Sequence, residues 1–112
     1  MNLVGEKINT DEAKCRPFDV KELHGAIAGT GAIRMSWGFN RPFSIEDTGY
    51  RFNVQGHHHR GYVYIFLNGM DLFDIYYTST QNNIKKVRND IYIDQLIEIL
   101  DTDIEKIPEY TS

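Results

Sequence analysis

Apolar residues recur with helical spacing in residues 17–29. Val20, Leu23 and Ile27 follow one another at i, i+3 and i+7, which places them on one face of a helix. Asp19 directly precedes them, and an aspartate in this position accepts hydrogen bonds from the free amides of the first turn. The pattern predicts an amphipathic helix that begins after Asp19.

A second helical pattern lies near the end of the chain. We predict Asp90 as its N-cap and Pro108 as the residue that stops it, because proline cannot continue a helix. The apolar positions of this helix are Ile93, Leu96, Ile97 and Leu100. Acidic residues occupy a different face, so the segment is predicted to be a second amphipathic helix.

Between the two helices the apolar residues alternate with period 2, which is typical of half-buried strands. Strands are predicted at residues 32–39, 50–54, 61–67, 71–80 and 84–87. Residues 40–49 are predicted to be a loop, because they contain Pro42 and an Asp-Thr-Gly turn signal. Asn68 and Gly69 predict a two-residue type I′ hairpin turn, since both tolerate positive φ.

These elements predict an α+β fold with one helix, an antiparallel meander of four to five strands and a C-terminal helix, the helices being packed on one sheet face. The chain has 112 residues, the length of one domain. Residues 1–16 show no sustained period, and we expect them to form an N-terminal arm. Residues 17–112 are expected to form a single α+β domain.

The predicted hairpin divides its residues between two sheet faces, and neither set is polar. One set contains Val63, Ile65, Leu67, Met70, Leu72, Asp74 and Tyr76, and the other contains Tyr62, Tyr64, Phe66, Asp71, Phe73, Ile75 and Tyr77. An antiparallel sheet covered on one side is expected to have a polar opposite face. We expect the helices to cover the first set, which leaves the second set, rich in aromatic residues, without a cover.

The aromatic set suggests an interface, most simply that of a two-fold homodimer. The predicted interface residues are Tyr62, Tyr64, Phe66, Phe73, Ile75 and Tyr77. One alternative is that the tyrosine rings are partly buried on an open face with their hydroxyls in water, or partly covered by the arm. Another is that the rings stack on the bases of single-stranded nucleic acid.

Three consecutive histidines, His57, His58 and His59, precede the strongest predicted strand. Side chains alternate along a strand, so only His57 and His59 share a face and form a candidate pair of metal ligands. The sequence marks no third ligand. The alternatives are a solvated hairpin connection and an acid/base or phosphate-binding role that includes Arg60.

Asp74 interrupts an otherwise apolar face, and a buried carboxylate needs a partner. A pair between Asp74 and His59, with Arg60 beside it, is the candidate catalytic site. The alternative is that Asp74 lies at the margin of the sheet and caps a loop or a helix terminus.

Composition narrows the classes of function. The single cysteine, Cys15, cannot form an intramolecular disulfide, which favours a reducing, cytoplasmic location. We expect no signal peptide, no membrane span and no cofactor. Residues 89–112 contain seven acids and one base, and residues 1–88 carry a net charge of +2. That charge disfavours a nucleic-acid partner, and the basic segment 85–88 is interpreted as a solvated edge strand.

The leading hypothesis is a small cytoplasmic module that acts through protein–protein contact, as a homodimer or with a protein partner. The first alternative is a small metal- or histidine-dependent enzyme, similar in chemistry to a hydrolase or nuclease and centred on the histidine corner. The second alternative is a weak binder of single-stranded nucleic acid. The sequence favours a role without catalysis over either of these alternatives.

Overall fold

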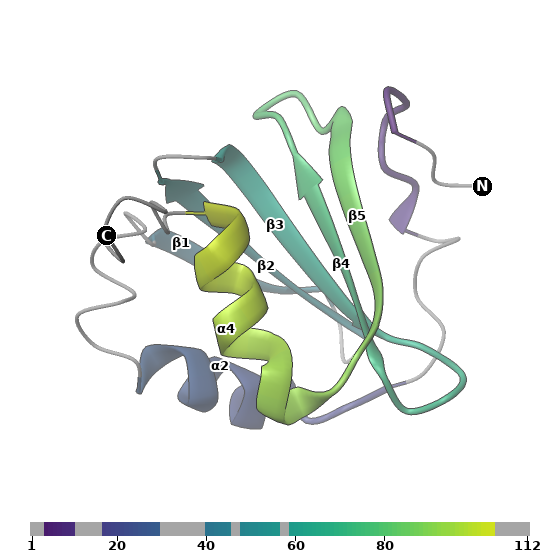
Figure 1. Cartoon of the computed structure of the whole chain (residues 1–112), viewed down its shortest axis with the longest axis vertical. Helices are drawn as coiled ribbons and strands as arrows, with labels where there is room; N and C mark the ends of the chain where they lie inside the picture. The colour runs from purple at the N-terminus through teal and green to yellow at the C-terminus, as the bar shows by residue number, and fades with distance from the viewer. Residues whose placement is uncertain (1–3, 11–16, 30–39, 46–47, 57–58, 105–112) are drawn as a thin grey trace, which may run out of the picture.

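The computed structural model describes residues 4–10, 17–29, 40–45, 48–56 and 59–104. It confirms the predicted α+β fold, with helices at both ends of a five-stranded antiparallel meander (Figure 1). The elements are α2 (Val20–Ala28), β1 (Asn40–Ile45), β2 (Gly49–Gln55), β3 (Arg60–Leu67), β4 (Phe73–Thr78), β5 (Ile84–Ile91) and α4 (Ile93–Ile104). The strands lie in chain order across the sheet.

Both predicted helices form, although only the first starts as expected. The Asp19 carboxylate accepts a hydrogen bond of 3.0 Å from the amide of Glu22, which confirms the predicted N-cap of α2. Asp90 does not cap α4, because it lies inside β5 with a φ of 60°. Strand β5 is therefore longer than predicted, and α4 begins only at Ile93.

Residues 40–45 form the edge strand β1, where a loop was predicted. Pro42 is tolerated here because an edge strand has one row of amides that need no partner in the sheet. The pairing between β1 and β2 is irregular between Asn40 and Phe43, on either side of the proline. The strand predicted at residues 32–39 lies outside the described residues.

The hairpin between β3 and β4 differs from the prediction in a way that changes both sheet faces. Leu67 pairs with Phe73, so the loop consists of the five residues 68–72. Neither Asn68 nor Gly69 has positive φ, and the left-handed residue is Asp71, with a φ of 63°. The Asn68 side chain closes the loop by accepting hydrogen bonds from the amides of Met70 and Leu72, at 2.8 and 3.2 Å.

Because this loop has an odd number of residues, the face assignment of β4 was wrong. Val63 pairs with Tyr77 and Ile65 with Ile75, on the face that we call the helix face. Tyr64 pairs with Tyr76 and Phe66 with Asp74 on the opposite face, which we call the aromatic face. Phe73, Ile75 and Tyr77 therefore lie with the aliphatic residues of β3, and the six predicted interface residues do not share one face.

The main hydrophobic core lies between the helix face and the two helices, of which α4 runs across the sheet and α2 lies near the bottom of the view in Figure 1. From the helices it includes Leu23, Ile27, Leu96, Leu100 and Ile104. From the sheet it includes Tyr50, Phe52, Val54, Val63, Ile65, Ile75, Tyr77 and Ile91. Leu23, Ile27, Leu96 and Leu100 therefore point toward the sheet as their spacing predicts, whereas Ile93, at the start of α4, is exposed.

The N-terminal arm lies against β5. Its backbone donates from Gly5 to Ile84 and accepts from Ile84 at Glu6, both at 2.7 Å. Ile8 packs onto a second cluster on the aromatic face, formed by Tyr64, Phe66 and Tyr76. The arm thus covers part of the face that the sequence left without a cover.

Candidate functional site

His59 is buried directly before β3. Its Nε2 atom lies 3.2 Å from the carbonyl oxygen of Tyr62, and its ring meets the ring of Tyr77 edge to face, with the centroids 5.2 Å apart. Burial, reinforced by the charge of Lys85, lowers the pKa of His59, and the backbone hydrogen bond opposes this only in part. His59 is therefore held as a neutral imidazole at pH 7.

Asp74 lies away from His59, near the opposite end of β3. Its carboxylate accepts hydrogen bonds from the Asn68 side chain at 3.0 Å and from the amide of Asp90 at 3.1 Å. Asp74 thus connects the 68–72 loop to β5. This position agrees with the alternative prediction that Asp74 lies at the margin of the sheet. The structure does not bring together His59 and Asp74, and Arg60 is exposed at the start of β3.

The predicted metal pair includes His57, which lies outside the described residues, as do His58 and Cys15. Among the described residues, no three His, Cys, Asp or Glu side chains lie close enough together to hold a metal ion. Neither described helix is long and apolar enough to cross a membrane.

Near His59 the structure forms an ion-pair cluster that the sequence analysis missed. The Asp103 side chain, only 2% exposed, accepts from Lys86 Nζ at 2.9 Å and from Arg88 Nε and Nη2 at 3.0 and 2.7 Å. Burial alone would raise the pKa of Asp103, but the hydrogen bonds from Arg88 and Lys86 outweigh it and hold the pKa below its usual value.

The Tyr77 hydroxyl is buried beside the same carboxylate. Burial and the charge of Asp103 raise the pKa of this phenol, so it stays protonated. The hydroxyl forms no hydrogen bond of good geometry with the described residues. Lys86 and Arg88 are committed to Asp103 at the C-terminal end of α4, where cations also compensate the helix dipole. The cluster is therefore best explained as a device that fixes α4 on β5.

Part of the aromatic face is already buried within the single chain. Within the single chain Tyr64 is 3% exposed and Phe66 is fully buried. The Tyr64 hydroxyl donates to Asn82 Oδ1 at 2.6 Å. Toward β1 the face is more open, and the Arg51 guanidinium lies over the rings of Phe43 and Tyr62, 4.9 and 4.8 Å from their centroids.

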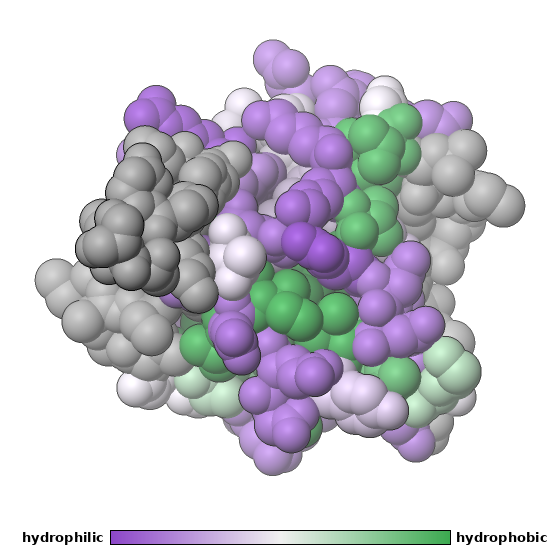
Figure 2. Space-filling model, viewed as in Figure 1, coloured by the Kyte–Doolittle hydropathy of each residue, from purple (hydrophilic) through white to green (hydrophobic). Residues whose placement is uncertain are grey.

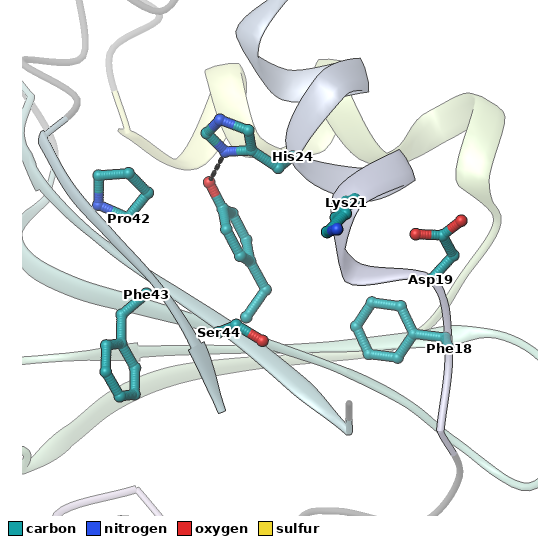
Figure 3. A pocket seen from close by; sticks show the side chains of 8 residues that line it. Phe18, Asp19, Lys21, His24, Pro42, Phe43 and Ser44 are labelled. Atoms are coloured by element: carbon teal, nitrogen blue, oxygen red, sulfur yellow. Dashed lines mark hydrogen bonds between the residues drawn. The ribbon is translucent and has the colours of Figure 1, made fainter. Parts of the chain in front are cut away.

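A cavity of about 550 Å³ lies between α2 and the edge of the sheet formed by β1 and β2 (Figure 3). We call it the His24 cavity. Its walls are Phe18, Asp19, Lys21 and His24 on the helix side and Pro42, Phe43, Ser44 and Tyr50 on the sheet side. A volume of this size is typical of small-molecule sites.

The polar centre of the His24 cavity is a side-chain pair. Tyr50 is 2% exposed, and its hydroxyl lies 2.6 Å from Nδ1 of His24 (Figure 3). The two rings also meet edge to face, with the centroids 5.7 Å apart. The sequence contained a local signal for this site, because Lys21 and His24 are three residues apart and thus share one side of the helix.

An apolar groove of about 350 Å³ lies on the other side of Phe18, between α2, the 68–72 loop and the start of α4. We call it the acidic groove. Its apolar walls include Phe18, Leu72, Phe73, Tyr92 and Ile93. Every charged residue in its lining is acidic, namely Asp19, Glu22 and Asp71. Figure 2 shows that hydrophobic patches lie among hydrophilic residues on the side of the molecule that carries α4.

Comparisons of this chain with protein-family models, with curated proteins and with solved structures find no match. Function is therefore inferred from the cavity, the groove and the side chains that line them.

Proposed function

We propose that this protein is a non-catalytic contact module that docks a segment of a partner protein in the acidic groove. The observation that carries the proposal is the exposure of two large apolar side chains at the rim of the groove. Tyr92 is 59% exposed and Ile93 is 55% exposed. Exposed apolar side chains that gather around a groove are typical of interaction sites.

The lining of the groove indicates the chemistry of the partner. Asp19 and Glu22 project from the first turn of α2, and Asp71 comes from the 68–72 loop on the other side. No lysine, arginine or histidine of the described chain lines the groove. A complementary segment has an apolar side chain that fills the groove, flanked by lysine or arginine residues that face the carboxylates.

This surface differs from the one predicted from the sequence, but the class of function is the same. A homodimer through Tyr62, Tyr64 and Phe66 stays a prediction, with most of that surface already buried in the single chain. The enzyme hypothesis needs His59 and Asp74 to converge, and they lie far apart along β3. A cytoplasmic location also stays a prediction, supported by the single cysteine.

The proposal is tested with designed peptides whose binding is mapped by the amide chemical shifts of the protein. One peptide carries a central leucine flanked by arginines, and a second carries the same leucine flanked by glutamates. We expect the basic peptide to shift the amides of Leu72, Tyr92 and Ile93 and the acidic peptide to leave them unchanged. Binding is expected to weaken with added salt, because exposed charges are screened.

Two charge-reversal variants test whether the basic peptide binds at the groove or elsewhere on the surface. Glu22→Lys is expected to weaken binding of the basic peptide at least fivefold, whereas Glu98→Lys, on the exposed side of α4, is expected to leave it within twofold. The proposal fails if both peptides bind equally, if neither binds or if the shifts map elsewhere. Concentration-dependent sedimentation that Tyr62→Ser abolishes would instead support the homodimer.

A further inference from the structure

We propose that the His24 cavity is a binding site for a small aromatic carboxylate. The ring of the ligand lies against Phe18 and Pro42, and its carboxylate lies at Lys21 and His24. This inference does not depend on the proposed docking function, because it concerns a different cavity and a different class of ligand.

The shape and the walls of the cavity favour a ring-sized ligand. The volume of about 550 Å³ exceeds what one benzene ring with a short substituent needs, and small-molecule sites usually combine apolar walls with a few polar groups. Phe18 and Pro42 come from opposite sides of the cavity (Figure 3). A flat ring placed between them contacts apolar surface on both sides, and such contacts favour an aromatic ligand over a flexible chain.

The polar centre of the cavity is held in place before any ligand arrives. Tyr50 belongs to the core, and its hydroxyl fixes one ring nitrogen of His24 at 2.6 Å. The edge-to-face contact of the two rings restricts the imidazole further. A side chain that is oriented in advance loses less conformational entropy on binding, which favours affinity.

Lys21 decides the sign of the ligand charge. It lies one turn before His24, lines the same cavity and forms no ion pair with any residue that the structure describes. The other charged residue of the lining, Asp19, accepts from the α2 amide of Glu22, so the positive end of the helix partly compensates its carboxylate. Asp19 is thus already bonded within the protein, whereas Lys21 has no hydrogen bond or ion pair with the described residues, so Lys21 is the charged side chain of this lining that favours a negatively charged ligand.

Ser44 supplies a hydroxyl on the opposite wall, from strand β1. The Lys21 ammonium and this hydroxyl belong to the same lining, and both are groups that can donate to a carboxylate oxygen. A phosphate ester would carry more charge than a single uncompensated lysine can balance. A monocarboxylate is thus the better match.

The inference is tested with benzoate as the probe and benzylamine, cyclohexanecarboxylate and acetate as comparisons, in titrations of the wild-type protein followed by amide chemical shifts. Benzoate is expected to shift the amides of Lys21, His24 and Ser44. Cyclohexanecarboxylate is expected to bind several-fold more weakly and acetate to give no saturable shift. Benzylamine is expected to bind at least tenfold more weakly than benzoate.

Substitutions of exposed lysines test which positive charge binds the carboxylate of benzoate, and they are not expected to disturb the fold. Lys21→Gln is expected to weaken benzoate at least fivefold, Lys21→Arg to restore binding to within twofold of wild type, and Lys85→Gln, on β5, to have no effect. The inference is overturned if benzoate causes no saturable shift at these amides, if benzylamine binds as well as benzoate, or if Lys21→Gln binds like wild type. Phe18 and Asp19 line both this cavity and the acidic groove, so the two experiments are distinguished by Lys21, which lines only the cavity, and by Glu22 and Ile93, which line only the groove.

Discussion

Replacing Asp103 by asparagine tests whether its buried carboxylate stabilises the fold. Asparagine keeps the shape of the side chain but removes the charge that receives three hydrogen bonds from Lys86 and Arg88. The two cations are not stranded by this change, because their side chains are 48% and 41% exposed and can turn to water. The cost is therefore that of the lost charged hydrogen bonds.

The expected magnitude follows from this geometry. Removing one partner of a fully buried ion pair costs about 3–5 kcal/mol, because the other charge is left without compensation. A hydrogen bond to a charged group contributes about 1.5–3 kcal/mol. Since the cations regain water and asparagine is cheaper to bury than aspartate, we expect a loss of about 2 kcal/mol, which lowers the Tm of a domain of this size by about 10 °C.

The measurement is urea unfolding at pH 7, followed by circular dichroism, for the wild type and for Asp103→Asn. Glu98→Gln is the matched control, since it removes one acidic charge from an exposed position of the same helix and is expected to change the free energy of unfolding by less than about 0.5 kcal/mol. If Asp103→Asn is as stable as this control, the carboxylate contributes no net stability.

The pH dependence of the difference gives a second check. The pKa of Asp103 is lower in the folded state than in the unfolded chain, so the folded state binds the proton less readily. The contribution of Asp103 is therefore fully present above its unfolded pKa of about 3.9 and is lost as pH falls through the folded pKa. The curves for wild type and Asp103→Asn are expected to run parallel from pH 8 to 5 and to converge below pH 4.

Three further tests address other parts of the fold. The pKa of His59 is lowered, so the wild type is expected to lose stability as pH falls below about 6.5. His59→Phe, which cannot bind the proton, is expected to lose less stability between pH 7 and 5. Equal losses in urea unfolding would contradict the effect of burial on His59. Gly61 has a φ of +136° and no room for a Cβ beside the next strand, so Gly61→Ala is expected to lower the free energy of unfolding by about 3 kcal/mol. Gly25 has open space around it in α2, so Gly25→Ala is expected to raise the free energy of unfolding by up to about 1 kcal/mol. Tyr64→Phe loses a buried hydrogen bond of 2.6 Å and is expected to lower the free energy of unfolding by about 1 kcal/mol. An unchanged free energy of unfolding would mean that this hydrogen bond contributes no net stability.

The elements of the fold could be predicted from the sequence because their signals are local. In α2 the cap and the stripe occur within nine residues, and Asp19, Leu23 and Ile27 behave as their spacing predicts. The edge strand β1 was missed because Pro42 and the following turn residues outweighed a short apolar segment. Treating proline as a sign of a loop ignores that the edge of a sheet tolerates a residue without an amide proton.

The assignment of residues to the two faces of the sheet could not be predicted with the same accuracy, because it depends on loop length. Asn68 and Gly69 resemble a tight turn, yet the Asn68 side chain binds the amides of Met70 and Leu72 and stabilises a longer loop. This preference of the loop shifts the register of β4, so Asp74 and Tyr77 exchange faces relative to the prediction.

A signal for the ion-pair cluster was present in the sequence. Asp103 lies seven residues after Leu96 and three after Leu100, so it occupies the apolar stripe of α4. A carboxylate on such a stripe needs a cation beneath it. Its partners, Lys86 and Arg88, come from a different element, and the His24 cavity likewise joins residues 26 positions apart. Pairings over such separations leave no periodic trace in a single sequence.

The 68–72 loop also constrains which changes in length this protein tolerates. Inserting or deleting one residue there would rotate β4 by half a turn relative to β3, driving Asp74 and Tyr76 into the main core and Ile75 and Tyr77 out of it. A change of two residues preserves the facing of every side chain in β4. Length variation at this hairpin is therefore expected to occur in steps of two.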